Sequence, residues 1–391
     1  MIIVIAPDSF KESLSSEEAC RAIEKGLRKA MPDARLVKNP MADGGEGTMD
    51  TIVKCSGGRI IKCKATDPLG GKITARCGLL DGGNTALIEM AEASGLALVP
   101  RGKRNPLKTS SYGTGEMIKF AIERGCKKIL LTLGGIATND AGVGIAEALG
   151  YKFLDERGRN IPRGAGGLKF LRHIDAKNAH PALSKRAFLA ACDVKNPLCG
   201  PNGSAAVYGP QKGATPGMVK EIEANLRNFA RVVNNDLKKD VLNVPGAGAA
   251  GGAGAGALAF LNASLKPGIE IVIELTRLEE KLKDADLVIT GEGRMDGQTV
   301  FGKTPAGVAK TAKKYGLPVI AFCGQIGEGA QKARAAGIDA IFSIADGPIS
   351  YEYSLKNAGK LLENAVEQAF GFMRVVMNMR VASGNDYASG K

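Results

Sequence analysis

The sequence has little of the chemistry that histidine and aromatic side chains provide. Tryptophan is absent, aromatic residues make up 5% of the 391-residue chain, and the two histidines are His173 and His180. So few imidazoles argue against a Ser-His-Asp triad and against a histidine-rich zinc site. The scarcity of aromatic rings argues against single-stranded nucleic acid as a ligand, because its bases stack on such rings.

The cysteines lack the spacing of a metal or redox motif. The eight cysteines include no C-x-x-C pair, and most lie in apolar or helical stretches. They are typical of reduced, buried thiols in a cytoplasmic protein, which is the localisation we expect. We expect no targeting segment, because the first apolar run, residues 1–5, is too short and lacks a basic flank. The Gly/Ala-rich stretch 246–259 contains few large apolar side chains and does not predict a membrane span.

The remaining composition is that of a glycine-rich α/β protein. Hydrophobic residues make up 44% of the chain, charged residues 24%, and there are 52 glycines. A chain of this length predicts about two or three domains. The net charge of +13 comes from scattered lysines and arginines, which favours small anionic substrates over nucleic acid.

Short apolar runs alternate with helical patterns at both ends of the chain. Residues 2–6 predict a buried strand, and Ser15 with Glu18 predicts a capping box at the start of a helix that ends near residue 30. The alternation returns near the C-terminus, which predicts the parallel, doubly wound sheet of a Rossmann-like domain. The strands expected there span 287–290, 319–323 and 340–344, and the helices span 306–315, 332–336 and 357–376.

The middle of the chain has a different pattern. Three strand-like runs, 60–65, 72–79 and 85–90, are separated by Asp/Gly-rich turns, which predicts an antiparallel meander. We therefore expect a discontinuous α/β fold. Residues 1–66 plus 284–391 would form the Rossmann-like domain, and residues 67–283 would form a large inserted α/β domain with antiparallel strands.

Two glycine-rich segments match nucleotide-binding patterns outside their usual context. Residues 297–304 match the Walker A pattern, but Gly291–Asp296 separates them from the preceding strand, and Pro305 removes a backbone N–H. We expect no true P-loop, although Lys303 or the helix start at Pro305 could contact phosphate. Residues 246–251 match G-x-G-x-x-G, but no clear strand precedes them, so they favour a tightly packed Gly/Ala helix over a dinucleotide fingerprint, with a phosphate-cradling loop as the other alternative.

Acidic residues recur beside glycines, in loops that follow predicted strands or begin helices. Such carboxylates can hold a divalent cation or position a hydroxyl, and lysine and arginine can neutralise a transferred phosphate. In open α/β sheets these groups meet at the carboxyl ends of the strands, so the set predicts a site for a metal ion and a phosphorylated ligand. Its acidic members are Asp8, Asp43, Glu46, Asp140, Asp193, Glu292 and Asp296, and its basic members are Lys11, Lys195 and Arg294.

Several motifs, in order along the chain, resemble those of the type I glycerate kinase family. The resemblance extends over about residues 1–375, and the tail after Val376 has no assigned motif. Glu12 stands where the family pattern favours glycine, and we expect no effect of this difference on the chemistry. The matching segments are 6–11 (APDSFK), 40–48 (PMADGGEGT), 111–115 (SYGTG), 134–140 (GGIATND), 192–198 (CDVKNPL) and 291–296 (GEGRMD).

The resemblance implies ATP- and Mg²⁺-dependent phosphorylation of D-glycerate, most often at the 2-hydroxyl. It also implies a two-domain enzyme with its active site in the interdomain cleft. The expected catalytic residues are Asp193, Asp296 and Lys11, and the expected metal ligands are Asp193 and Asp296. The expected substrate-binding residues are Asp8, Ser9, Asp43, Glu46 and Arg294. The expected nucleotide- or phosphate-binding residues are Gly134, Gly135, Thr138, Asn139, Asp140 and Lys303.

Alternatives remain open at this point. The same kinase could give 3-phosphoglycerate, and the residues assign neither the oligomeric state nor which carboxylate is the base. From the residues alone, the main alternative is a nicotinamide-dependent hydroxyacid dehydrogenase, although its fingerprint at 246–251 is out of context. A sugar-acid sensor that binds DNA is a third hypothesis, but no helix-turn-helix lies beside a basic recognition helix.

Overall fold

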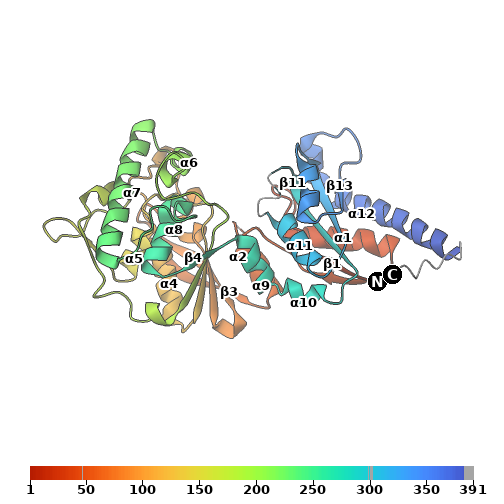
Figure 1. Cartoon of the computed structure of the whole chain (residues 1–391), viewed down its shortest axis with the longest axis horizontal. Coiled ribbons are helices and arrows are strands. Elements are labelled where there is room, and N and C mark those ends of the chain that lie inside the picture. Colours follow the sequence, from red (N-terminus) through yellow and green to blue (C-terminus); the bar gives the residue numbers. More distant parts are fainter. Residues whose placement is uncertain (46, 298, 300–302, 383–391) are drawn as a thin grey trace. The chain divides into compact units, whose positions relative to one another are not determined.

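The chain folds into two compact units. The computed structural model describes residues 1–45, 47–297, 299 and 303–382. The terminal unit comprises residues 1–43 and 272–391, and the central unit comprises residues 44–271 (Figure 1). Within both described units, parallel strands and helices make up an α/β fold, as the sequence predicts.

The limits of these units differ from the expected domain boundaries at 66 and 284. On the N-terminal side, β3 (Arg59–Thr66) pairs along its whole length with β4 (Lys72–Leu80), so β3 belongs to the central sheet. On the C-terminal side, the division falls within α9 (Gly268–Leu275), the helix that leads back into the terminal unit. The apolar run of β3 therefore continues the antiparallel meander instead of ending the first part of the terminal unit.

A parallel sheet forms the centre of the terminal unit, with the strand order β13-β12-β11-β1-β2. The chain builds outward from β1 to β2 on one side, and from β11 to β12 and β13 on the other. In such sheets the crevice at the switch point, outside the carboxyl ends of the strands, is where ligands bind. The strands are β1 (Ile2–Ile5), β2 (Arg35–Lys38), β11 (Leu287–Met295), β12 (Val319–Ile326) and β13 (Ala340–Ser343).

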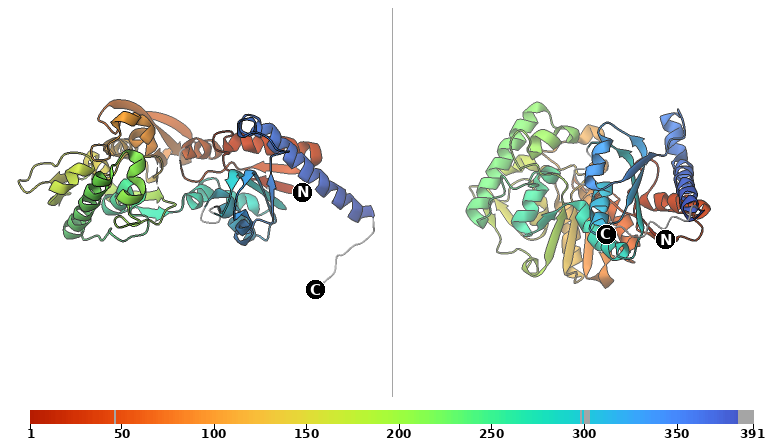
Figure 2. Two further views of the ribbon diagram at one scale, coloured as in Figure 1. Left: turned by 90° about the horizontal axis from the view of Figure 1, so that it is seen from above. Right: turned by 45° about the vertical axis from the view of Figure 1, so that its right-hand side comes forward.

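Two helices of the terminal unit pack against each other beside this sheet. α1 (Ser16–Ala30) begins with the predicted capping box, in which the Glu18 N–H donates to Ser15 and the Ser15 N–H donates to the Glu18 carboxylate. α12 (Tyr351–Ala382) lies alongside α1 (Figure 2), so closely that a Cβ added at Gly26 would lie 2.5 Å from a carbonyl oxygen of α12. Further helices of this unit are α10 (Leu278–Leu282) and α11 (Thr304–Lys313).

A mixed sheet forms the centre of the central unit, with the order β10-β9-β6-β5-β4-β3. The pairs β3–β4 and β4–β5 are antiparallel, which confirms the predicted meander, and the pairs from β5 to β10 are parallel. The other strands of the sheet are β5 (Thr85–Glu89), β6 (Lys128–Thr132), β9 (Ala187–Ala191) and β10 (Ser264–Lys266), and β7 (Lys152–Leu154) pairs separately with β8 (His173–Asp175).

The helices of the central unit bury apolar side chains against this sheet and against one another. Figure 1 shows α4, α5, α7 and α8 packed around the strands. The bounds are α2 (Thr48–Cys55), α3 (Ala91–Ser94), α4 (Tyr112–Glu123), α5 (Val143–Ala148), α6 (Ser204–Tyr208), α7 (Pro216–Leu237) and α8 (Ala249–Phe260).

The glycine-rich segment around residue 250 packs tightly, as predicted. Gly251 has φ +67°, and a Cβ there would lie 1.8 Å from the Thr138 carbonyl oxygen. A Cβ at Gly256 would lie 2.4 Å from the Ala141 carbonyl oxygen, so α8 lies directly against this loop. Residues 238–248 contain no strand, and the segment therefore lacks the strand–turn–helix context of a dinucleotide fingerprint.

A few elements differ from the sequence prediction in extent or type. The helix expected at 332–336 is a 3₁₀ helix, Ala330–Ala336. β11 continues to Met295 because it pairs with β12 as far as Ile326. All eight cysteines are free thiols. Among the helices of the described residues, none combines the length and the apolar character of a membrane span.

Candidate active site

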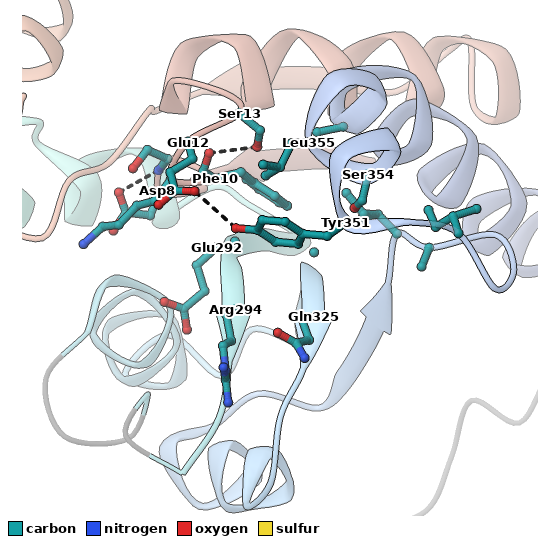
Figure 3. Close-up of a pocket in the computed structure, with 18 of the residues that line it drawn as sticks. Asp8, Phe10, Glu12, Ser13, Glu292, Arg294, Gln325, Tyr351, Ser354 and Leu355 are labelled. Carbon is teal, nitrogen blue, oxygen red and sulfur yellow. Dashed lines mark hydrogen bonds between the residues drawn. The ribbon is translucent and has the colours of Figure 1, made fainter.

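A cavity of about 630 Å³ lies at the carboxyl ends of the parallel strands of the terminal unit (Figure 3). The loop after β1, the end of β11 and the segment before α11 all contribute to its lining, so the cavity surrounds the switch point of the sheet. Several charged and polar residues that the sequence pattern selects line this cavity, namely Asp8, Ser9, Lys11, Asp43, Glu292, Arg294 and Lys303.

Asp8 is a buried carboxylate at the end of β1. Its N–H donates to the Gly291 carbonyl oxygen, which extends the pairing of β1 with β11 and fixes the position of the residue. The Thr304 hydroxyl and the Ser9 N–H donate to its two carboxylate oxygens, at 2.5 and 2.6 Å. Burial, together with the nearby charge of Asp43, raises the pKa of Asp8 to about 6. Part of the Asp8 population therefore carries a proton near neutral pH.

Glu292 is a second buried acid in the same cavity. Only 8% of the residue is exposed, and the Thr299 hydroxyl donates to its Oε1 at 2.7 Å. Burial raises the pKa of Glu292 to about 7, although the Thr299 hydrogen bond and the charge of Lys303 act in the opposite direction. Two buried acids with raised pKa values in one cavity are typical of a functional site, because a stability-optimised core would avoid them.

The cations of the cavity pair with half-buried and buried carboxylates, and two of these cations, Lys11 and Arg294, are themselves exposed. Lys11 Nζ lies 3.0 Å from Asp43 Oδ2, and Arg294 Nε lies 3.3 Å from Asp296 Oδ2. Lys303 Nζ lies 3.8 Å from Asp296 Oδ1 and 3.9 Å from Glu292 Oε2. The structure thus brings Asp296 to the cations of this cavity. Exposed ion pairs of this kind contribute little stability, so an incoming anion can replace the carboxylate at low cost.

Asp193 lies in the central unit, two residues after the end of β9. Its Oδ1 accepts a hydrogen bond of 2.7 Å from the Gly268 N–H, at the first residue of α9. A Cβ added at Gly44 would lie 3.5 Å from Asp193 Oδ2 and 2.8 Å from Gly268 Cα, so glycine at position 44 lets the chain pass close to this carboxylate. Asp193 is exposed, as is Lys195 two residues later, so a ligand can reach both side chains.

The loop after β6, also in the central unit, is mostly buried. Gly135 is exposed, whereas Thr138 and Asn139 are 0% exposed and Asp140 is 1% exposed. Asp140 accepts hydrogen bonds from the N–H and hydroxyl of Ser111 and from two backbone N–H groups at the start of α5. In this structure Asp140 therefore supports the backbone of its own loop. Gly134 is half-buried beside it.

A buried lysine that the sequence analysis did not select contacts this loop. Lys212 is 2% exposed, and its Nζ donates to the Thr138 carbonyl oxygen at 2.6 Å. Burial lowers the pKa of Lys212 to about 7, an effect that the charge of Asp140 partly offsets. Thr138 Oγ1 and Asn139 Oδ1 are buried, and neither has a hydrogen-bond partner among the described residues. The loop thus carries buried polar atoms that its own fold leaves unsatisfied.

Comparison with known proteins identifies the family. The family model described as "Glycerate kinase family" matches residues 3–374. The chain belongs to the glycerate kinase family. It is therefore an enzyme, a kinase.

Relatives of this kinase match it over most of their length. A glycerate kinase of Halalkalibacterium halodurans is 50% identical over 363 residues, which cover 93% of this chain and 96% of the relative. A glycerate 2-kinase of Escherichia coli is 50% identical over 344 residues, which cover 88% of this chain and 91% of the relative. The crystal structure of a putative glycerate kinase 2 from Salmonella typhimurium is similar with a TM-score of 0.88 and 46% identity, covering 97% of this chain and 99% of that one.

The carboxylates of the kinase suit a magnesium ion that is shared with phosphate. The described residues contain no group of three or more side chains that could hold a metal by themselves. Mg²⁺ commonly takes one or two protein carboxylates and completes its shell with water and phosphate oxygens. Buried acids whose pKa values are raised by burial, as at Asp8 and Glu292, would be relieved by a nearby cation. The donor set therefore fits a metal that arrives with a nucleotide.

Some residues of the site could not be found from sequence, and one predicted residue falls outside the described structure. Glu46 lies in a position that the structure does not describe. Tyr351 and Gln325 line the cavity although neither belongs to a quoted motif. The signal for Gln325 is its position at the end of a predicted strand of the sheet, next to the ligand-binding edge. Lys212 follows Pro-Gln in an unremarkable turn, and no local pattern marks it as buried.

Proposed function

We propose that this kinase transfers the γ-phosphoryl group of ATP to the 2-hydroxyl of D-glycerate and gives 2-phosphoglycerate. Relatives that are about half identical to this chain carry the name glycerate kinase, and the Escherichia coli relative is named glycerate 2-kinase. The main structural support is the cavity at the switch point, where buried acids and exchangeable cations lie together.

The cations of the terminal unit suit the charge of the transferred group. Phosphoryl transfer depends mainly on positioning and on stabilisation of negative charge. Lys11 and Lys303 would contact the phosphates, and Arg294 would pair with the carboxylate of glycerate or with the γ-phosphate, since its guanidinium can bind either in a bidentate manner. Asp8, Ser9 and Asp43 would complete the substrate contacts, together with Glu46.

Asp193 would position the substrate hydroxyl and accept its proton. It is exposed, and the hydrogen bond from the Gly268 N–H to its Oδ1 orients the side chain. Asp193 and Asp296 would be the carboxylate ligands of Mg²⁺, which would neutralise charge on the phosphates. We propose further that the site forms when the two units close on the substrates, because the transfer needs water to be excluded.

The loop 134–140 would support the nucleotide from the central unit. Gly134 and Gly135 can offer backbone N–H groups, since they are at least partly exposed. Thr138, Asn139 and Asp140 would act only after a rearrangement that exposes them, because each is now at most 1% exposed.

A coupled assay of ADP release tests this function. Purified protein is incubated with MgATP and D-glycerate, with L-glycerate and buffer as controls, and the product is identified by ³¹P and ¹³C NMR. We expect ADP release that depends on D-glycerate and a phosphate on C2. Release of ADP with a phosphate on C3 would overturn the assigned hydroxyl alone, whereas no release with either acid would overturn the proposed substrate. Binding of NADH, measured by its fluorescence, would instead favour the dehydrogenase alternative.

A further inference from the structure

The cavity of the terminal unit has two sides with different chemistry. One side, at β1 and β11, carries Asp8, Lys11, Glu292, Arg294 and Lys303. The other side is formed by the connection from β13 to α12 and by the first turns of α12, where apolar residues dominate the lining. These apolar residues are Ile344, Pro348, Ile349, Leu355 and Ala358.

The spacing of the strands separates these two sides. β13 is the edge strand, and β12 lies between it and β11. Two strand spacings amount to about 10 Å, so Ile344, which directly follows β13, lies about that far from the charged end of β11. A volume of about 630 Å³ is in the range of cavities that hold drug-sized or nucleotide-sized ligands. Glycerate, a three-carbon acid, would fill only a small part of it, and it offers no apolar surface to the second wall.

Tyr351 extends from the start of α12 into this cavity, toward the loop after β1 (Figure 3). The residue is 66% exposed, so its ring contributes little to the apolar core. Its hydroxyl donates to Glu12 Oε2 at 3.2 Å, which fixes the direction of the ring. A fixed and exposed ring at the border of an apolar wall presents a flat surface on which a base can stack.

Glu12, the acceptor of this hydrogen bond, has a left-handed backbone. Its φ is +68°, in a region that favours glycine, the residue that the sequence resemblance leads us to expect at this position. A non-glycine residue at such an angle is a local strain that persists only when its surroundings hold it. Here the side chain lines the cavity and binds Tyr351, so the strained residue and the exposed ring support each other at one place.

We propose that the nucleoside part of ATP binds on Tyr351 and the apolar wall formed by residues 344–358, with its triphosphate directed toward Lys11, Arg294 and Lys303. This inference rests on the proposed function for the identity of the co-substrate. Glu12 is a positioning residue in this arrangement, because it acts on the nucleotide through the orientation of Tyr351. The Gln325 amide, which also lines the cavity, lies within the terminal unit where it can face the edge of a bound base.

Two probes separate the nucleoside contact from the phosphate contact. MgATP carries both parts, whereas magnesium tripolyphosphate carries the phosphates alone. Dissociation constants for both are measured by titration calorimetry, which needs no turnover. The variants are Tyr351→Ala, which removes the ring, and Tyr351→Phe, which keeps the ring and loses the bond to Glu12. Tyr353→Ala is the matched control, because Tyr353 is 52% exposed on the same turn of α12 and does not line the cavity.

We expect Tyr351→Ala to weaken MgATP binding about tenfold, the effect of losing one base–aromatic stack. Its affinity for tripolyphosphate and its KM for glycerate should stay at the wild-type values. Tyr351→Phe should lie between wild type and Tyr351→Ala, and Tyr353→Ala should bind both probes as wild type does. Glu12→Gln keeps an acceptor oxygen and should retain most of the ATP affinity, whereas Glu12→Gly should lose part of it. Circular dichroism checks that each variant is folded.

Each other outcome overturns the subsite. Unchanged MgATP binding in Tyr351→Ala would remove the ring from the nucleotide site. An equal loss for tripolyphosphate would place Tyr351 at the phosphates, and a higher KM for glycerate alone would assign Tyr351 to the acid substrate instead of the nucleoside. A wild-type protein that binds neither probe would overturn the proposed ATP dependence and the subsite together, and it is distinguished from the other cases by the absence of any wild-type signal.

Discussion

The buried Lys212 should make the stability of the central unit depend on pH, and its replacement tests this expectation. Burial lowers the pKa of Lys212 from 10.5 to about 7, with a partly opposing effect of Asp140. For a group whose pKa is lower in the folded state, the stability contribution is fully present above the unfolded pKa and is lost as the pH falls toward the folded pKa. The contribution of Lys212 to the free energy of unfolding therefore changes between pH 7 and pH 10.5.

The size of the effect follows from the two pKa values. Within this pH range, the unfolded state binds about one proton more than the folded state, so the free energy of unfolding rises by about 1.4 kcal/mol per pH unit. Between pH 7.5 and 9.5 the Lys212 contribution should grow by about 2.5 kcal/mol. Lys212→Met removes the titrating group and should remove this increment, while the aliphatic part of the side chain still fills the site.

The measurement is urea denaturation followed by circular dichroism at pH 7.5, 8.5 and 9.5. The quantity of interest is the difference in the free energy of unfolding between wild type and Lys212→Met, and how this difference changes with pH. Lys177→Met is the matched control, because Lys177 is an exposed lysine of the same unit. A difference for Lys212→Met that stays constant, or that falls as the pH rises, would mean that Asp140 keeps the ammonium charged, and the argument from burial would be refuted.

Further predictions concern the active site and the packing of α8. Asp193→Asn should keep the hydrogen bond from Gly268, because an amide oxygen can also accept it, yet lower kcat by about 100-fold or more through loss of the base; near-wild-type turnover would exclude Asp193 from the mechanism. Arg294→Lys keeps the charge but loses the bidentate geometry, so the KM for glycerate or for MgATP, whichever anion Arg294 binds, should rise by about tenfold. An unchanged KM for both substrates would show that Arg294 touches neither anion. Gly251→Ala should destabilise the protein by about 3 kcal/mol or more, because the position has φ +67° and the new Cβ would lie 1.8 Å from a carbonyl oxygen. Gly217→Ala is its control, since the nearest atom lies at 3.9 Å, and equal melting temperatures for the two variants would contradict the packing argument. Removal of Mg²⁺ with EDTA should abolish ADP release, and added MgCl₂ should restore it; activity that persists in EDTA would exclude a metal ion from the transfer.

Local signals in the sequence predicted local structure well. The capping box of Ser15 and Glu18 lies within four residues of the chain, and the structure contains it with both hydrogen bonds. The meander of β3, β4 and β5 was predictable because its turns are short and rich in glycine. The doubly wound sheet was predictable because apolar runs alternate with helical periodicity at both ends of the chain.

Features that depend on contacts between distant residues could not be predicted in this way. The turns of the meander predict that β3 pairs with β4, but they do not show where the first part of the terminal unit ends, so the expected limit at residue 66 differs from the limit of the compact unit at residue 43. The sequence selected Asp140 as a possible ligand residue because of its place in a glycine-rich loop. Its hydrogen bonds with Ser111 join residues 29 positions apart in the chain, and no local pattern predicts this contact.

The cavity of the terminal unit combines groups that differ in how firmly the fold holds them. Asp8 and Glu292 are buried and each accepts a hydrogen bond from a threonine hydroxyl, so their positions are set before any ligand arrives. Lys11 and Arg294 are exposed and paired with carboxylates at 3.0 and 3.3 Å, contacts that an anion can displace. A site for phosphoryl transfer needs both properties, because fixed acids define the geometry of the reacting groups and mobile cations must follow charge from one phosphate to the next. A substitution that holds one of these cations more firmly should therefore slow turnover, even where it strengthens ligand binding. Replacing Lys11 with arginine tests this, since a bidentate pair with Asp43 would hold the cation more firmly, and we expect kcat to fall while the affinity for MgATP changes by less than about threefold.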